Sequence, residues 1–223
     1  MGLLLLVRHG QASFGAEDYD VLSETGFAQA RRLGAHLREL GLAPGAVIHG
    51  GMRRQRETAE AMAQAAGLDV PLETDPRWAE FDHLSVISAY DAVAGTDQRG
   101  LGRREFQALF EKATGRWVSE AHDDDYAETY RGFAGRVRDA LGHAARQAGA
   151  GQVAVVVTSG GTIAAACAML TEVGEEPRRQ SAAWQRFNTV VVNASVTRVV
   201  VGSTGARLLT FNEHSWLVLV PQR

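Results

Sequence analysis

The residues best equipped for chemistry stand near the start of the chain, in the run Arg8-His9-Gly10-Gln11. An imidazole can attack an electrophile or carry a proton near neutral pH, and a guanidinium binds oxyanions through a planar fork of N–H groups. We interpret Gly10 as the residue that lets the backbone turn and leaves the imidazole uncovered. A lone histidine is most often a hydrogen-bonded structural residue, but the neighbouring arginine and glycine favour a functional one here.

The five apolar residues 3–7 predict how this run is positioned. A continuous apolar stretch bounded by polar residues is typical of a strand buried on both faces of an α/β sheet. Ligands of open α/β sheets bind outside the carboxyl ends of the strands. We therefore expect Arg8 and His9 to leave the sheet together and to enter a ligand site.

A second strand of this kind ends at Ser159-Gly160-Gly161. Residues 153–157 are all apolar, and the glycines lead into an apolar helix. Backbone N–H groups at the start of such a helix attract anions, so this turn is a second candidate phosphate element. A nucleophilic role for Ser159, as in α/β-hydrolases, would require the pattern G-x-S-x-G, and Val157 occupies the first glycine position.

The remaining elements connect these two strands and extend the sheet. After the first strand we expect a polar loop over 11–24, a helix from its N-cap Ser23 to Gly41, a strand at 47–48, a helix that follows Gly51 and closes at Gly67, and a strand around 71–73. The second half predicts an insertion over 84–125 with helical fragments around 104–113, followed by a helix over 126–148 and the strand over 153–157. It then predicts an antiparallel pair over 188–201 and 207–211 around a turn at 202–205, and a terminal strand over 217–220.

This order predicts an α/β fold, namely a three-layer α/β/α sandwich with a mostly parallel sheet and antiparallel C-terminal strands. The length of 223 residues suits a single domain over 1–223 with a helical insertion at about 84–125. The run Asp123-Asp124-Asp125 lies in this insertion. We interpret it as a solvated loop or a cap of the next helix and not as a metal site.

Composition narrows the function further. The net charge of −3 gives no global electrostatic case for nucleic acid or an anionic membrane. Lys112 is the only lysine, so no Walker-type phosphate lysine exists and arginine is the available phosphate ligand. Cys167 is the only cysteine, which excludes an internal disulfide and suits a small core residue. The short apolar N-terminus resembles neither a signal peptide nor a membrane span, so we expect a soluble, cytoplasmic protein.

Several motifs, taken in order, resemble the histidine phosphatase superfamily, which includes cofactor-dependent phosphoglycerate mutases. Arg8-His9-Gly10-Gln11 is similar to its signature at the end of the first strand. The family's other motifs are resembled by Leu22-Ser23-Glu24-Thr25-Gly26 with Gln29-Ala30, by Arg54-Gln55-Arg56-Glu57-Thr58-Ala59, by Ala127-Glu128-Thr129, and by Ser159-Gly160-Gly161 in place of an H-G-G turn. The resemblance therefore spans nearly the whole chain.

The resemblance implies that His9 is a nucleophile that forms a phosphohistidine. It implies that Arg8 and Arg54 neutralise the phosphoryl oxygens, since positioning and charge carry most of phosphoryl-transfer catalysis. The family protonates the leaving group with a carboxylic acid, a role that Glu80 matches best and Asp82 second. An acid there must be protonated, which requires partial burial against Trp78 or Phe81 and a raised pKa.

Further substrate contacts are expected from Gln11, Ser159 and Gly160. We interpret Arg53 and Arg56 as surface charge, because Arg56 stands about 200° around its helix from Arg54. His49 and His214 are treated as structural residues.

The chain also departs from the family pattern. Ser159 replaces the second histidine, Gln55 replaces the usual alanine, and Gly15 falls where many members carry a phosphate-contacting asparagine. A neutral donor is about half as strong as a charge-assisted one, and losing a transition-state donor costs roughly 2.7–4 kcal/mol.

The sequence thus predicts a phosphatase that hydrolyses small phosphate monoesters without a metal or other cofactor. The alternative is a non-catalytic or very slow relative that binds a phosphate ligand, and mutase activity is less expected. The expected partner is a small phosphorylated substrate, not nucleic acid or a membrane, and a homodimer is compatible with this sequence.

Overall fold

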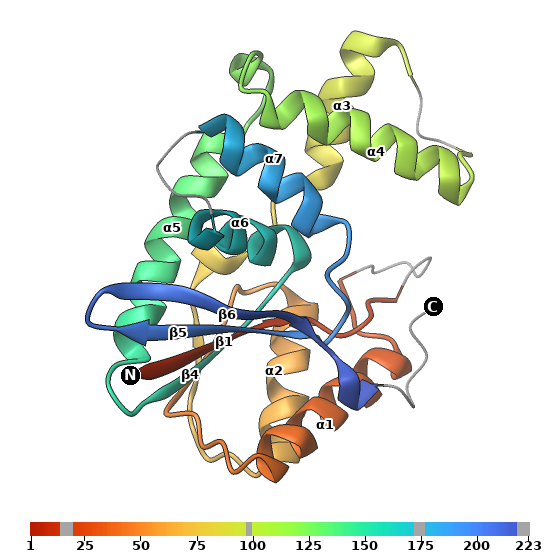
Figure 1. The fold of residues 1–223 in the computed structure, drawn as a ribbon. Helices are drawn as coiled ribbons and strands as arrows, with labels where there is room; N and C mark the ends of the chain where they lie inside the picture. The colour runs from red at the N-terminus through yellow and green to blue at the C-terminus, as the bar shows by residue number, and fades with distance from the viewer. Residues whose placement is uncertain (14–19, 97–99, 172–176, 218–223) are drawn as a thin grey trace.

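A computed structural model describes residues 1–13, 20–96, 100–171 and 177–217 and shows one six-stranded sheet between helical layers (Figure 1). The spatial order of the strands is β3-β2-β4-β1-β5-β6. The first four strands of the chain are parallel to one another. The fifth pairs antiparallel with the first, and the sixth pairs antiparallel with the fifth. The strands are β1 (Gly2–Arg8), β2 (Ala46–His49), β3 (Leu72–Thr74), β4 (Val153–Thr158), β5 (Val196–Gly202) and β6 (Gly205–Glu213). The predicted mostly parallel α/β fold with antiparallel C-terminal strands is confirmed.

Helices cover both faces of this sheet and also form a separate group beside it (Figure 1). One face packs against α1 (Glu24–Glu39) and α2 (Arg53–Ala66), and the other against α5 (Tyr130–Gln147), α6 (Gly160–Thr171) and α7 (Pro177–Asn188). The region predicted as an insertion contains α3 (His83–Ala94), α4 (Arg103–Val118) and the short 3-10 helix η2 (Asp123–Asp125).

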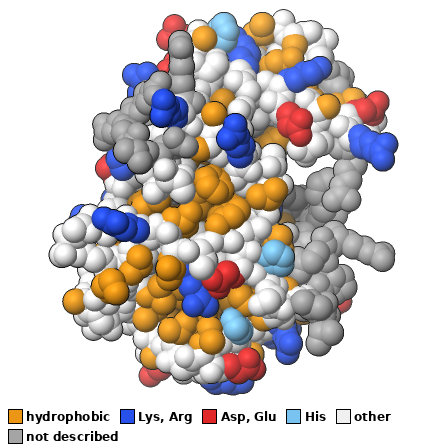
Figure 2. Space-filling view, in the orientation of Figure 1, with side chains coloured by type: hydrophobic (Ala, Val, Ile, Leu, Met, Phe, Trp, Pro, Cys, Tyr) orange, Lys and Arg blue, Asp and Glu red, His pale blue; other side chains and the backbone are white. Residues whose placement is uncertain are grey.

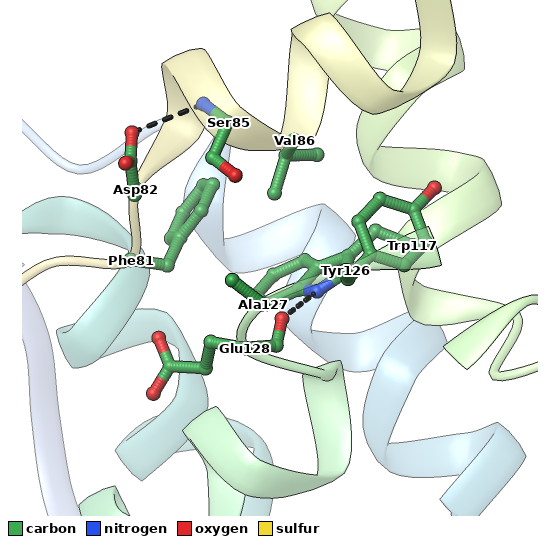
Figure 3. Close-up of a pocket in the computed structure, with 8 residues that line it drawn as sticks. All are labelled: Phe81, Asp82, Ser85, Val86, Trp117, Tyr126, Ala127 and Glu128. Carbon is green, nitrogen blue, oxygen red and sulfur yellow. Dashed lines mark hydrogen bonds between the residues drawn. The ribbon is translucent and has the colours of Figure 1, made fainter. Parts of the chain in front are cut away.

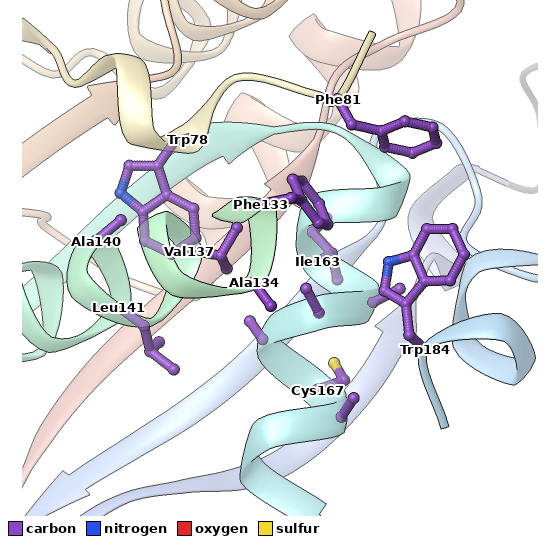
Figure 4. Close-up of a cluster of buried hydrophobic side chains, with 14 of the residues drawn as sticks. Trp78, Phe81, Phe133, Ala134, Val137, Ala140, Leu141, Ile163, Cys167 and Trp184 are labelled. Atoms are coloured by element: carbon purple, nitrogen blue, oxygen red, sulfur yellow. The ribbon is translucent and has the colours of Figure 1, made fainter. Parts of the chain in front are cut away.

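The apolar strands divide their side chains between two hydrophobic clusters. On β1, Leu4 and Leu6 join a large cluster with α5 and α6, whereas Leu5 and Val7 join a smaller cluster with α1 and α2. Alternate residues of a strand point to opposite faces, so an apolar residue at every position means that both faces are covered. Figure 4 shows part of the larger cluster, where Cys167 packs as a buried core residue. Burial raises the pKa of its thiol to about 12.

A serine cap begins α1 and a glycine ends α2, as predicted. The Ser23 hydroxyl accepts a hydrogen bond from the Gly26 N–H at the start of α1, and Gly67 closes α2 in the left-handed conformation. These end points follow from local chemistry, because a serine oxygen satisfies a free N–H group and glycine accepts a positive φ.

Three predicted elements in the second half differ from the structure. The helix predicted over 126–148 begins at Tyr130, because the Thr129 hydroxyl caps it by accepting from the Gly132 N–H. The predicted strand over 188–201 is wrong in its first part, since Asn188 ends α7 and β5 begins only at Val196. Leu217 lies in a 3-10 helix and not in a terminal strand, and residues 218–220 lie outside the described part.

A cavity of about 150 Å³ lies between the insertion and the core (Figure 3). The Phe81 and Trp117 rings stack beside it with centroids 4.8 Å apart, and Trp117 Nε1 donates to the Glu128 carbonyl oxygen. The lining is mostly apolar, with two carboxylates and no basic residue: Phe81, Asp82, Ser85, Val86, Trp117, Tyr126, Ala127 and Glu128. The cavity is therefore suited to an uncharged group more than to an anion.

The surface shows no large basic region on the face drawn in Figure 2, where hydrophobic side chains gather near the β5–β6 hairpin and charges of both signs surround them. Among the described residues, no helix has the length and hydropathy needed to cross a bilayer.

Candidate active site

The candidate site forms where β1 and β4 end side by side. Arg8 pairs with Thr158 in the parallel register, and the His9 N–H donates to the Thr158 carbonyl at 2.8 Å. His9 and Ser159 are consequently the next pair beyond the sheet. Both continue the alternation that faces α1 and α2, so both side chains meet the first turn of α2.

The hydrogen bonds of His9 define its tautomer. Its Nδ1 lies 2.7 Å from the Gly10 carbonyl oxygen, which can only accept, so Nδ1 carries the hydrogen. The lone pair is then on Nε2, where Arg54 Nε donates at 3.2 Å. Burial, followed by the charges of Arg54 and Arg8, lowers the pKa of His9 well below its usual value. The ring is therefore neutral at neutral pH and has a nucleophilic nitrogen aimed at Arg54.

His9 is not uncovered as predicted, since only 5% of the residue is exposed. The prediction was wrong because the first turn of α2 brings Arg54 directly onto the ring. Gly10 has a different function from the one expected. A Cβ at Gly10 would lie 2.5 Å from the Gly26 carbonyl oxygen, so glycine is required for the close approach of α1.

Arg54 is held from both ends of its guanidinium. Besides its contact with His9, its Nη1 lies 2.7 Å from Asp20 Oδ1 in an ion pair. The side chain is buried, whereas those of Arg53 and Arg56 are 48% and 53% exposed and pair with carboxylates on the same helix. Of these three arginines, only Arg54 reaches the site, in agreement with the predicted surface position of the other two.

Arg8 approaches from the opposite face of the sheet. Its Nη1 donates to the Val191 carbonyl oxygen, and a Cβ placed on Gly160 would lie 3.7 Å from its Cζ. The guanidinium therefore lies directly beside the start of α6, at ordinary van der Waals range from Gly160. The charge of Arg8 still contributes to the lowered pKa of His9, after burial and the charge of Arg54.

Glu80 reaches the same helix start. Its carboxylate accepts from the Gly161 N–H at 2.9 Å and from the Phe81 N–H at 3.2 Å. Burial raises its pKa, although the two N–H groups, Arg54 and Arg8 act in the other direction. The raised pKa is the predicted one. Asp82 instead lies exposed and caps α3 by accepting from the Ser85 N–H, so it has a structural explanation.

Gln11 lies against the start of α1. Its Oε1 accepts from the Ser23 hydroxyl at 3.0 Å, and its N–H donates to Gln29 Oε1 at 2.8 Å. These contacts tie the loop after β1 to the helix cap. Its contact with a substrate phosphate stays a prediction.

Three site residues were missed by sequence reasoning. Asp20 pairs with Arg54, and Gln55 donates from Nε2 to the Ser159 hydroxyl oxygen at 2.9 Å. His83 begins α3, and burial and the charge of Arg54 lower its pKa. A signal existed for Gln55, because it and Ser159 are two departures from one family pattern. Nothing in the sequence indicates that Asp20 and His83 lie near Arg54. Gly15, the third departure, lies outside the described residues.

The other histidines with predicted structural roles have bonded ring nitrogens. His49 Nδ1 accepts from the Gly51 N–H, and its Nε2 lies 3.3 Å from Thr74 Oγ1. His214 is exposed, with Nδ1 2.6 Å from the Asn212 carbonyl oxygen. Within the described ranges there is no group of three or more His, Cys, Asp or Glu residues placed to hold a metal ion.

The fold and these side chains define a class of α/β protein that gathers a neutral histidine, two arginines and a carboxylic acid at the carboxyl ends of its strands. More particularly, the chain belongs to the histidine phosphatase superfamily. The model of branch 1 of that superfamily matches residues 4–214.

Individual relatives carry the names of both mutases and phosphatases. The chain is 34% identical over 140 residues to a 2,3-bisphosphoglycerate-dependent phosphoglycerate mutase of Corynebacterium glutamicum. The aligned region covers 57% of this chain and 56% of that protein. The match thus spans about half the length of that relative.

Two solved structures share the fold at lower identity. A mycobacterial glucosyl-3-phosphoglycerate phosphatase has a TM-score of 0.65 at 23% identity, covering 96% of this chain and 100% of its own. A phosphoserine phosphatase mutant of Entamoeba histolytica has a TM-score of 0.70 at 16% identity, covering 98% and 100%.

Proposed function

We propose that this protein is a phosphatase that hydrolyses small phosphate monoesters through a phosphohistidine at His9. The observation that carries the proposal is the state of His9, a neutral imidazole whose Nε2 lone pair faces Arg54. A nitrogen of this kind can attack phosphorus, and the adjacent guanidinium can hold the phosphoryl oxygens as their charge changes.

In the first step, His9 Nε2 forms a bond to phosphorus while the bond from phosphorus to the leaving oxygen breaks. The phosphoryl group must replace the Arg54 Nε contact on this lone pair, so Arg54 moves from the ring to the phosphoryl oxygens. Protonated Glu80 supplies the proton that the leaving alkoxide needs, which its raised pKa favours. In the second step, Glu80 takes a proton from water as the water oxygen forms a bond to phosphorus and the bond from phosphorus to His9 Nε2 breaks. Inorganic phosphate then leaves, and neutral His9 and protonated Glu80 are regenerated.

Hydrolysis is favoured over mutase chemistry by the arrangement of the basic groups. A phosphoglycerate also carries a carboxylate that needs a cationic partner. Arg136, a further arginine near Glu80, binds the Glu128 carboxylate at 2.6 Å and donates to the carbonyl oxygens of Arg77 and Ala79. Because Arg136 is already paired in this way, we infer a monoester with an uncharged leaving group.

The test is a direct search for the covalent intermediate. The protein is mixed with a radiolabelled monoester and quenched at alkaline pH, where phosphohistidine survives, while phosphate release is followed in parallel. We expect an acid-labile adduct and phosphate release from the parent and from the control His122→Ala, whose exposed histidine lies at η2. Neither is expected from His9→Ala.

A second candidate function is supported by one observation, the neutral Ser159 in place of the family's second histidine. A protein that binds inorganic phosphate but forms no adduct and releases no phosphate from any monoester would be a phosphate-ligand binder. That result would contradict the phosphatase proposal and support this alternative.

A further inference from the structure

Ser159 and Gln55 form a buried polar pair directly beside His9. Ser159 follows β4 just as His9 follows β1, and Gln55 follows Arg54 in the first turn of α2. The exposed fractions of Gln55 and Ser159 are 0% and 1%, so neither group exchanges its hydrogen bonds freely with water. Polar groups buried this deeply are costly unless their hydrogen bonds are made.

The contact with Trp78 favours the Gln55 NH₂ group as the donor to Ser159, and Gln55 Oε1 is then buried without a hydrogen-bond partner among the described residues. Gln55 Nε2 lies 3.4 Å from the Trp78 carbonyl oxygen and 2.9 Å from Ser159 Oγ. A carbonyl oxygen can only accept, which favours the NH₂ group as the amide end that faces Trp78. The same NH₂ group then donates to Ser159 Oγ, and the serine hydroxyl points its own hydrogen elsewhere.

Ser159 is also relieved of the usual function of a serine at a helix start. It precedes α6, and its carbonyl oxygen accepts from the Ile163 N–H as that of an N-cap residue does. An N-cap serine normally uses its hydroxyl oxygen to accept from the second or third N–H of the helix. Here the serine oxygen accepts from Gln55 Nε2 instead, and the Gly161 N–H donates to Glu80 at 2.9 Å.

Among the described residues, the Ser159 hydroxyl oxygen accepts from Gln55 Nε2, and no hydrogen bond in which this hydroxyl donates is observed. A buried hydroxyl donor needs an acceptor, and the phosphoryl group would supply it when bound between Arg8, Arg54 and His9. We propose that Ser159 donates a hydrogen bond to a phosphoryl oxygen and that Gln55 is the positioning residue that aims this hydroxyl. The inference rests on the proposed phosphatase function, because it assigns the third donor of that reaction.

The pair is thus a neutral replacement for a cationic donor. A hydroxyl does not change its charge over the working pH range, so this contact is independent of pH. Because this donor is neutral, the positive charges that we expect beside the phosphoryl group, among the described residues, are those of Arg8 and Arg54. Since a preorganised donor acts most strongly on the charge of the transition state, its loss should affect kcat more than KM.

The experiment measures kcat, KM and the inhibition constant of orthovanadate for four proteins: the parent, Ser159→Ala, Gln55→Leu and the double variant. We expect Ser159→Ala to lower kcat about a hundredfold and to weaken vanadate inhibition by a similar factor. Gln55→Leu has nearly the same volume and leaves the hydroxyl in place without aiming it. It should lower kcat about tenfold.

The double variant separates positioning from a merely structural role. If Gln55 acts through Ser159, adding Gln55→Leu to Ser159→Ala causes less than about a twofold further loss. Thr114→Val is the matched control, because it removes a buried hydroxyl that donates to the Phe110 carbonyl in α4. Its kcat should equal that of the parent, and unfolding midpoints of all variants verify folding.

Two results would overturn the inference. One is a folded Ser159→Ala variant with parental kcat and vanadate inhibition. The other is a full tenfold effect of Gln55→Leu in the Ser159→Ala background, which would mean that Gln55 acts independently of the hydroxyl.

Failure of the proposed function would look different. In that case the parent would form no phosphohistidine and release no phosphate. The hydroxyl contact is then tested by calorimetry with inorganic phosphate alone. About fivefold weaker binding by Ser159→Ala supports the contact, and unchanged binding refutes it.

Discussion

Replacing Glu80 with glutamine tests whether this carboxyl group transfers the proton. The amide has nearly the same shape, and its oxygen can still accept from the Gly161 N–H, as Glu80 does at 2.9 Å. The NH₂ group cannot accept from the Phe81 N–H, so the weaker bond of 3.2 Å is lost at a cost of about 1 kcal/mol. The substitution therefore preserves the local fold and removes the transferable proton.

The expected loss depends on the leaving group. A general acid contributes about 10²–10⁴ in rate, which corresponds to about 3–5 kcal/mol in the activation free energy. An alkyl phosphate needs the full contribution, because an alkoxide is a poor leaving group. A nitrophenyl phosphate does not, because nitrophenolate leaves without a proton. The second step still needs Glu80 as the base that activates water.

Rapid-mixing measurements with both substrates provide the assay. With nitrophenyl phosphate, Glu80→Gln should release one burst of nitrophenolate per active site and then stall, with phosphohistidine accumulating at His9. With an alkyl phosphate it should show neither burst nor turnover above about a hundredth of the parental rate.

Asp82→Asn is the matched control, because it makes the same chemical change at the neighbouring carboxylate. Asparagine caps helices as well as aspartate does, so α3 should keep its cap and kcat should stay within about twofold of the parent. Parental turnover of an alkyl phosphate by Glu80→Gln would refute the assignment of the acid. Loss of turnover in Asp82→Asn alone would move the role to Asp82.

Three further predictions follow from the site. Because the pKa of His9 is lowered, kcat/KM should decline on the acid side only below the usual histidine pKa of 6.5. Folding stability should fall as pH drops below 6.5, because His9 of the unfolded chain then binds a proton that it does not bind in the folded protein. A titration midpoint of His9 above 6.5, measured by NMR, would contradict the expected pH dependence of both kcat/KM and stability. Gly161→Ala places a Cβ 2.5 Å from Glu80 Oε1 and should displace the carboxyl group. We expect kcat for alkyl phosphates to fall about a hundredfold in a folded protein. Parental kinetics would show that the position of the carboxyl group is not critical. Ser159→His alone should cost about 1–3 kcal/mol of unfolding free energy, because Gln55 fills the adjacent space. The double variant Gln55→Ala with Ser159→His should recover stability and have a higher kcat than Ser159→His alone. Equal stability of the single and double variants in denaturant melts would contradict this expectation.

Much of the site's framework could be predicted from the sequence. The apolar runs that end at Val7 and Val157 predict two strands buried on both faces, and the structure pairs them as neighbours in a parallel register. The positions of Arg8 and His9 beyond one strand, and of Ser159 beyond the other, follow from these runs. The raised pKa of Glu80 was also expected, since a proton donor in this position must be buried. The catalytic roles of these residues stay predictions that the experiments above test.

Some boundaries were beyond local reasoning. The sequence predicts no helix where α7 lies, and it places the start of β5 at Asn188, eight residues before Val196. Short segments of mixed polar and apolar residues have similar local preferences for both structures, so packing against neighbours decides between them.

Burial patterns and turn chemistry act over a few neighbouring residues, so the order of residues is enough to predict two strands buried on both faces and the functional groups at their ends. The contacts of Arg54 with His9 and Asp20, and the hydrogen bond from Gln55 to a serine 104 positions away, appear only in the folded chain. Such contacts depend on how α2 docks against the ends of β1 and β4. The docking is a property of the packed molecule, since the partners are far apart in the chain and no local pattern links them.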